Sequence, residues 1–131
     1  MHACIDNFIH TYAGVELRLK MHEIMTKQGH EEETGKAKIT SGYNLPAKYI
    51  LHTVGPIIQW KVTKKDEELL ASCYRECLRL AADTGAESIA FCCLSTGVFR
   101  FPQQRAAEIA TNTVKQYLDK DSSCLLYTSD A

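Results

Sequence analysis

Three side chains that could do chemistry stand close together at the start of the chain: His2, Cys4 and Asp6. Imidazole and thiolate are ligands that zinc prefers, and catalytic zinc sites use three protein ligands with one position left open. Two ligands do not complete such a site. On spacing alone Cys4 also fits a small core residue, and His2 a frayed terminal one. Asp6 equally fits a first-turn carboxylate stabilised by the helix dipole, and His10 fits an ordinary polar contact.

A second candidate is the segment STGVFRFP, residues 95–102, which lies between an apolar strand pattern and a helical pattern. In open α/β sheets, ligands bind beyond the carboxyl ends of strands, where backbone N–H groups of a turn or helix N-terminus hold phosphate. Ser95, Thr96 and Gly97 suit that role, and Phe99 could cover a sugar or base. Many such turns carry Ser, Thr and Gly for capping alone, so that alternative stays open.

The first half of the chain contains the elements that would position the His2 to Asp6 group. Residues 5–25 have helical apolar spacing that is interrupted at Gly14, which predicts one long helix or two short ones. Residues 28–36 are polar and predict a loop. Residues 37–40 and 49–54 predict two strands, and the single turn between them suggests that they pair.

The second half contains the elements that would position the 95–102 segment. Thr63 and Asp66 resemble a capping box, from which a helix runs toward Gly85. Residues 88–95, SIAFCCLS, form a continuous apolar run, which predicts a strand buried on both faces beneath helices. The inner stripe of a third helix is Ala106, Ile109, Ala110, Thr113, Val114 and Tyr117. The order of strand, helix, strand, glycine loop and helix predicts an α/β fold.

Composition excludes several kinds of partner. The chain has 131 residues, enough for one domain, and its 15 Lys and Arg nearly cancel its 16 Asp and Glu. We therefore expect no nucleic acid and no membrane as partner. No segment has the pattern of a signal peptide or transmembrane helix, which predicts a cytoplasmic protein. The six cysteines are interpreted as reduced thiols. They are Cys4, Cys73, Cys77, Cys92, Cys93 and Cys124.

Nearly the whole chain, from His2 to about Leu118, resembles a macrodomain, the ADP-ribose-binding fold. The resemblance rests on five segments in matching order: CIDNFIHTYAG, TGKAKITSGYNLPAKYILHTVGP, LLASCYRECLRLA, SIAFCCLSTGVFRFP and AAEIATNTVKQYL. It implies a three-layer α/β/α fold with a mixed central sheet. Ordinary macrodomains carry a glycine-rich loop where this chain has HACIDNFIHTYAG. His and Cys in place of the glycines resemble the zinc-containing microbial class, which removes mono-ADP-ribose from proteins.

The resemblance implies a role for each residue near the start. Asp6 falls on an aspartate near the distal ribose, where it would orient or deprotonate the attacking water or bind ribose hydroxyls. His2 and Cys4 fall on two of the three zinc ligands, and the zinc would bind a ribose hydroxyl or the attacking water. Cys4, Ile5 and Asp6 also line the diphosphate and distal ribose.

The 95–102 segment falls on the second phosphate-binding loop of the family. The resemblance places Ser95, Thr96, Gly97, Val98 and Phe99 in contact with ADP-ribose, with Phe99 against the distal ribose. Val98 stands where the zinc class often has an acidic residue, which is a departure from the pattern.

The implied activity is a zinc-dependent protein mono-ADP-ribosyl hydrolase, which cleaves ADP-ribose from modified side chains. Its implied partners are ADP-ribose and a mono-ADP-ribosylated protein, such as a lipoylated carrier protein modified by a sirtuin-type transferase. The alternative is a module that binds ADP-ribose without cleaving it.

Three features of the family are missing from the sequence: the third zinc ligand, which is a cysteine upstream of His2, the first strands with their asparagine motif, and an acidic residue for adenine. We therefore expect Met1 to be an internal start, and residues 1–123 to be a partial macrodomain with impaired activity. Residues 124–131, CLLYTSDA, match a translated sequencing adapter and are expected to be non-native. A true edge strand is the alternative interpretation of that tail.

Overall fold

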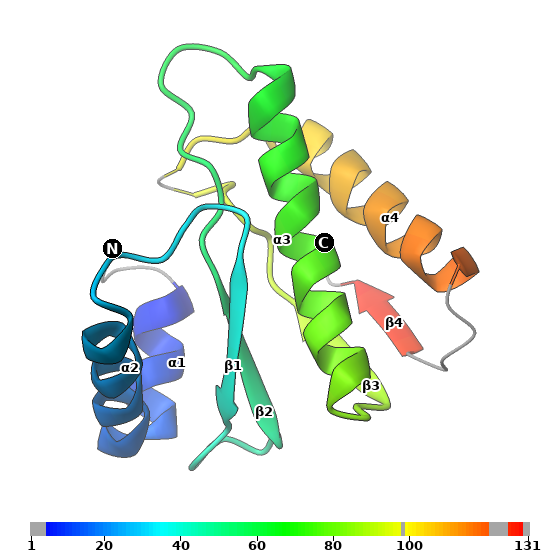
Figure 1. Ribbon diagram of the computed structural model, residues 1–131. Coiled ribbons are helices and arrows are strands. Elements are labelled where there is room, and N and C mark those ends of the chain that lie inside the picture. Colours follow the sequence, from blue (N-terminus) through cyan, green and yellow to red (C-terminus); the bar gives the residue numbers. More distant parts are fainter. Residues whose placement is uncertain (1–4, 98, 121–125, 130–131) are drawn as a thin grey trace.

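The computed structural model describes residues 5–97, 99–120 and 126–129 of the chain (Figure 1). Helices and strands alternate along much of the chain, which confirms the predicted α/β class. The elements are α1 (Ile5–Ala13), α2 (Val15–Gln28), β1 (Ala37–Ser41), β2 (Tyr49–Thr53), α3 (Lys64–Asp83), β3 (Ser88–Phe91), α4 (Gln103–Lys120) and β4 (Leu126–Ser129).

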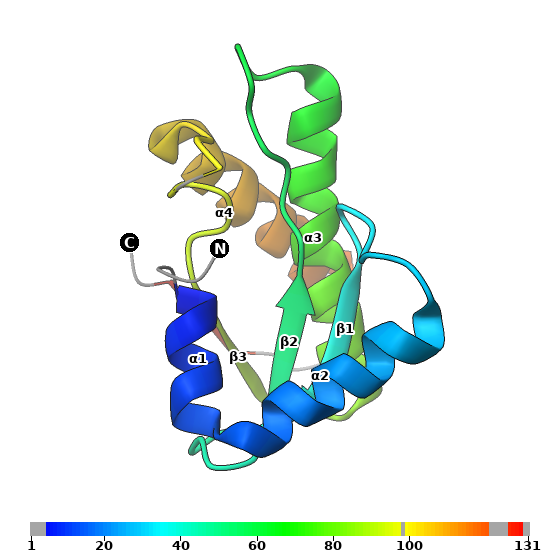
Figure 2. The same ribbon diagram turned by 90° about the vertical axis from the view of Figure 1, so that its left-hand side faces the viewer.

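The N-terminal helical segment is two helices, as one of the two predicted alternatives has it. Gly14 separates α1 from α2 with a φ of 99°, a conformation that glycine adopts without steric cost. Its N–H donates to the carbonyl of His10 at 3.1 Å, which closes the last turn of α1. The chain therefore changes direction at Gly14, and α1 and α2 lie at an angle to each other (Figure 2).

The two strands predicted in the first half pair in an antiparallel hairpin. β1 and β2 are in register from Ala37 opposite Thr53 to Ser41 opposite Tyr49. The Thr53 hydroxyl also donates to the carbonyl of Lys36 at 2.6 Å, beside the first pair of the ladder. The predicted pairing is confirmed, and it directs the carboxyl end of β2 toward the connector that leads to α3.

The capping box predicted at the start of α3 is present. The Thr63 hydroxyl accepts from the N–H of Asp66 at 3.1 Å, and the Asp66 carboxylate accepts from the N–H of Thr63 at 2.9 Å. α3 and α4 pack together, and the apolar stripe predicted for α4 faces this core. The buried residues of the cluster are Ile58, Leu70, Ala71, Tyr74, Leu78, Phe101, Ala106, Ile109 and Val114.

The prediction of a strand over residues 88–95, buried on both faces, is wrong. β3 ends at Phe91, and Cys92 and Cys93 follow it as exposed residues without regular structure. Within β3, Phe91 and Ile89 pack against the core, and the Phe91 ring lies 5.0 Å from the ring of Tyr74. Ser88 and Ala90 are exposed. The strand alternates because α3 and α4 cover only one of its faces.

β3 pairs in parallel with β4, so the described strands form two ladders: β1 with β2, and β3 with β4. Both antiparallel and parallel pairs are present, as in a mixed sheet. α1 and α2 lie to one side of the strands, and α3 and α4 to the other (Figures 1 and 2). β4 belongs to the segment predicted to be non-native, and its pairing does not test the origin of that segment.

Two further observations concern the cysteines and the helices of the described residues. Cys73, Cys77, Cys92 and Cys93 are free thiols. No helix in the described part of the chain is both long and apolar enough to cross a membrane.

Candidate functional site

The loop between β3 and α4 has an irregular backbone that brings polar groups to the carboxyl end of a strand. Ser95 and Arg100 adopt positive φ angles of 63° and 65°, which residues with a side chain adopt uncommonly. The N–H of Phe101 donates to the carbonyl of Ser95 at 2.8 Å, and that of Arg100 to the carbonyl of Gly97 at 3.0 Å. These bonds fold the chain back on itself into a compact loop.

The loop is fixed at its end by Phe101, whose side chain is 1% exposed and lies in the core cluster with residues of α3 and α4. The N–H of Ala106 then donates to the carbonyl of Pro102 at 2.9 Å at the start of α4. Because a buried aromatic side chain anchors the segment, the loop stands on a rigid base.

The connector after β2 supports the loop from the neighbouring strand. The N–H of Ile58 donates to the carbonyl of Phe99 at 2.8 Å. A Cβ on Gly55 would lie 1.9 Å from the Ser95 hydroxyl oxygen, so only glycine fits there. The residue types along the chain do not predict the contribution of Gly55 and Ile58, although the Gly-Pro pair directly after a predicted strand is a signal of a turn there.

The loop has hydrogen-bonding groups that the described part of the chain does not use. The backbone N–H groups of Ser95, Thr96, Gly97 and Phe99 donate to no described acceptor. The Ser95 hydroxyl is buried and has no described partner either. Since unpaired N–H groups in a turn at a strand end form an anion-binding concavity, this geometry favours phosphate binding over simple capping.

Only part of the predicted N-terminal group can be located. Asp6 is the second residue of α1, directly after Ile5, as expected for the first turn of a helix. That first turn lies at the same end of the molecule as the carboxyl ends of β2 and β3 (Figure 2). The predicted site residues His2, Cys4 and Val98 lie outside the described residues.

His10 joins α1 to the hairpin. Its ring lies 6.1 Å from the ring of His52 on β2, and the Thr40 hydroxyl lies 2.9 Å from Nε2 of His52. Thr40 is 6% exposed, so this contact lies largely inside the protein. The polar contact is between Thr40 and His52, and His10 adjoins it through its ring, so an ordinary polar contact at His10 stays a prediction.

The described residues do not include a metal site. No group of three His, Cys, Asp or Glu side chains within residues 5–97, 99–120 and 126–129 is placed to hold an ion. The two donors implied for zinc, His2 and Cys4, are one fewer than the three protein ligands typical of catalytic zinc. Zinc binding by this chain is therefore a proposal that rests on the resemblance of the HACID segment.

The fold and this loop define an α/β domain with a turn of unpaired backbone N–H groups at the carboxyl end of β3. The family model of the Macro domain matches residues 1–110, and the chain belongs to the macro domain family. The match confirms the family that the five sequence segments resemble.

Curated relatives carry a name that states an activity. A "Protein-ADP-ribose hydrolase" from Treponema medium is 61% identical over 124 residues, which are 95% of this chain and 48% of that protein. One from Staphylococcus aureus is 59% identical over 125 residues, which are 95% of this chain and 47% of that protein. The chain thus spans about half the length of the curated relatives it matches.

A solved structure has the same fold. The Oceanobacillus iheyensis macrodomain with ADP superimposes with a TM-score of 0.86 at 42% identity, over 94% of this chain and 65% of that one. The similarity supports the fold of this chain.

Proposed function

We propose that this chain is part of a hydrolase that removes mono-ADP-ribose from a modified protein side chain. The observation that carries the proposal is the turn with unpaired N–H groups at Ser95, Thr96, Gly97 and Phe99, in a sequence 61% identical to a protein-ADP-ribose hydrolase. Such a turn suits the diphosphate of ADP-ribose, and Phe99 suits the ribose beside it.

The reaction requires a group that activates water. We assign this role to Asp6, because the first turn of α1 lies at the same end of the molecule as the phosphate-binding turn (Figure 2). The Asp6 carboxylate would orient water and accept its proton as the oxygen attacks the anomeric carbon of the distal ribose. The bond from that carbon to the protein side chain breaks, and the side chain leaves with a proton.

Zinc dependence is proposed for the whole protein from the resemblance of the HACID segment. His2 and Cys4 would be two of its three protein ligands. When bound, the metal would supply Lewis-acid stabilisation of a ribose hydroxyl or of the attacking water. The steps assigned to Asp6 and to the turn do not pass through it.

The modified protein is proposed on the resemblance alone to be a lipoylated carrier protein that a sirtuin-type transferase modifies. A second candidate function is a module that binds ADP-ribose without cleaving it. The relative solved with ADP favours this alternative as much as it favours the enzyme, because a bound nucleotide does not imply cleavage.

The test uses the 131-residue chain and a chimera in which these residues replace the matched region of the Treponema medium relative. Each is incubated with a mono-ADP-ribosylated protein, and released ADP-ribose is measured by mass spectrometry. We expect Asp6→Asn in the chimera to lower release by about 100-fold, the usual effect of losing a general base. Calorimetry should find the affinity for free ADP-ribose little changed.

Asp119→Asn, at an exposed position near the end of α4, is the matched control and should leave release unchanged. A chimera that binds ADP-ribose but releases none would refute the hydrolase and favour the binding module. Absence of binding would refute both functions.

A further inference from the structure

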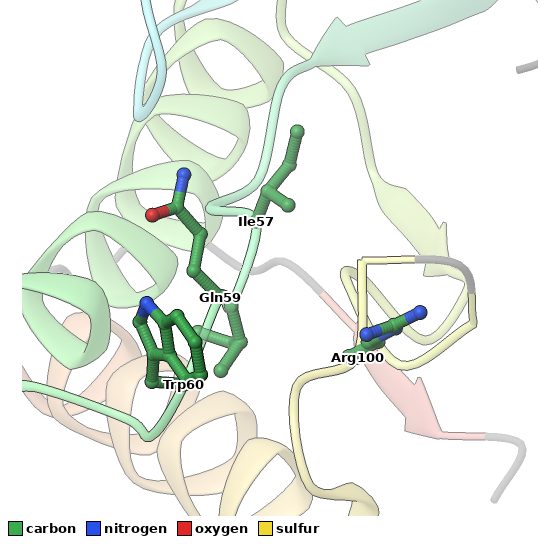
Figure 3. Close-up of a pocket in the computed structure, with 5 residues that line it drawn as sticks. Ile57, Gln59, Trp60 and Arg100 are labelled. Carbon is green, nitrogen blue, oxygen red and sulfur yellow. The ribbon is translucent and has the colours of Figure 1, made fainter.

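A groove lies beside the phosphate-binding turn, on the connector from β2 to α3. It has a volume of about 470 Å³ and is lined by Ile57, Ile58, Gln59, Trp60 and Arg100; we call it the Trp60 groove (Figure 3). Trp60 is 95% exposed and Ile57 is 60% exposed. Large apolar side chains with so much exposed area next to a functional loop indicate a contact surface.

Exposed cations lie at the Trp60 groove and in the segment that directly follows it. Arg100 lies across the groove from Trp60, and Lys61, Lys64 and Lys65 follow Trp60 along the chain. All four cations are exposed, and none forms an ion pair within the part of the chain that the structure describes. A partner with negative charge would therefore meet cations that no described carboxylate neutralises.

The nearest carboxylates along the chain are already engaged. Asp66 accepts from the N–H and hydroxyl of Thr63 in the capping box. Glu67 pairs with Arg105, whose guanidinium lowers the pKa of the Glu67 carboxyl, and Glu68 pairs with Arg75 on α3. Glu67 and Glu68 are thus paired with cations of the fold, and Asp66 is the one of these three acids without a cationic partner among the residues that the structure describes. The four exposed cations outnumber it, so net positive charge remains for a partner.

The groove is continuous with the proposed site. Ile58 donates to the carbonyl of Phe99 at 2.8 Å, and Arg100 follows Phe99 in the same loop. In an ADP-ribosylated protein the modified side chain is joined to the distal ribose, which the resemblance places against Phe99. The polypeptide that carries the modification must therefore leave the site close to this loop, and the groove is the hollow that adjoins it.

We propose that the Trp60 groove binds an acidic stretch of the ADP-ribosylated protein, next to the modified side chain. This inference rests on the proposed function. Tryptophan and arginine are enriched at protein interfaces and contribute much of their binding energy. The apolar faces of Trp60 and Ile57 would contact the peptide, and Arg100 and Lys61 would select Asp and Glu near the modified position.

The experiment compares two mono-ADP-ribosylated peptides that differ only in the flanking residues, four Glu in one and four Gln in the other. The chimera described above should cleave the Glu peptide with a higher kcat/KM. We expect the double substitution Trp60→Ser and Arg100→Asn to lower kcat/KM for the Glu peptide about tenfold, or about 1.4 kcal/mol. The Gln peptide and the affinity for free ADP-ribose should change by less than about twofold.

Lys48→Gln, at an exposed position on the connection between β1 and β2, is the matched control and should alter neither peptide. The preference for the Glu peptide should also weaken in concentrated salt, which screens exposed charges. If the double substitution at Trp60 and Arg100 lowers kcat/KM equally for both peptides, or lowers it for neither, the proposed docking surface is overturned. The proposed hydrolase would stay in place.

A separate measurement covers the case in which neither peptide is cleaved and the proposed hydrolase fails. Trp60 is the only tryptophan of the chain, so its fluorescence reports on the groove directly. Titration with the Glu peptide should change the emission at lower concentration than titration with the Gln peptide. Identical titrations would overturn the docking surface independently of catalysis.

Discussion

At the scale of single residues, Gly55 illustrates how one position shapes the loop. A Cβ there would lie 1.9 Å from the hydroxyl oxygen of Ser95 and 3.2 Å from its Cβ. Gly55→Ala must therefore displace Ser95 and the turn that contains it. We expect the free energy of unfolding to fall by about 1–3 kcal/mol, the usual cost of overpacking, as measured by urea titration. Calorimetry should find weaker ADP-ribose binding.

Gly97→Ala is the control for that change. A Cβ on Gly97 would meet no atom within 4 Å, so the urea midpoint should stay close to that of the wild type. If Gly55→Ala unfolds at the same urea concentration as Gly97→Ala, the close approach between Gly55 and Ser95 does not constrain this fold.

The cysteines also differ residue by residue. Burial raises the pKa of Cys77 from its ordinary value of 9.0 to about 12 and raises that of Cys73 as well, whereas Cys92 and Cys93 are exposed. The thiolate is the reactive form, so iodoacetamide at pH 8 should modify Cys92 and Cys93 first. Mass spectrometry of peptides at successive times measures the order, and rapid labelling of native Cys77 would contradict it.

The same pKa shift affects stability. The folded state keeps Cys77 neutral, so this contribution to the free energy of unfolding is complete below about pH 9. It is lost as the pH rises toward 12, because the unfolded chain can then release the proton that the folded chain retains.

Denaturation is the control for the labelling order. In guanidine, where burial is absent, all four described cysteines should react alike with iodoacetamide.

Local residue types predict the turn between β3 and α4, but they do not reveal which residues support it. Ser95, Thr96 and Gly97 between a strand and a helix indicate a phosphate-binding turn from the sequence. The support from Gly55 and Ile58 comes from a segment about 40 residues away and depends on how two strands lie side by side. The assignment of Asp6 rests on resemblance, because spacing alone fits a helix-capping charge equally well.

At the scale of elements, the start of α3 depends on a reciprocal cap. The Thr63 hydroxyl accepts from the N–H of Asp66, and the Asp66 carboxylate accepts from the N–H of Thr63. Thr63→Ala removes the first of these bonds and should lower the free energy of unfolding by about 1 kcal/mol, as measured by thermal denaturation. Because α3 carries much of the core, the whole domain should show the loss.

Thr111→Ala tests whether the loss at Thr63 belongs to the cap. Thr111 is exposed within α4, where alanine is the better helix former, so stability should be unchanged or slightly higher. A Thr63→Ala protein that melts at the same temperature as Thr111→Ala would mean that the cap does not contribute.

The helices were easier to predict than the strands for a physical reason. α3 and α4 each have an apolar stripe along many turns, and their facing stripes form the core. The residues at helical apolar spacing are therefore the residues that are buried. For SIAFCCLS, composition predicts burial but cannot show how many faces are covered. β3 has α3 and α4 over one face, and the strand therefore alternates and ends before Cys92.

At the scale of the whole molecule, the strands form two separate ladders. Among the described residues, β2 pairs only with β1, and β3 pairs only with β4. β2 and β3 each have one edge that faces away from the strand they pair with. The backbone N–H and C=O groups along that edge have no partner strand in the described part of the chain. Such edges favour pairing with another molecule. The family fold is present, but its strands are less protected than in a closed sheet.

This arrangement predicts that the 131-residue chain associates with itself as its concentration rises. Ala90 is exposed on β3, so Ala90→Lys adds a charge to that strand without entering the core, and it should reduce association, as charges on natural edge strands do. Sedimentation velocity at several concentrations measures the effect.

Ala107→Lys is the control. Ala107 is exposed on α4, so the substitution adds the same charge away from the strands, and the variant should associate like the wild type. If both lysine variants reduce association equally, net charge rather than the β3 strand governs it; if the wild type sediments as a monomer throughout, the open edges do not pair.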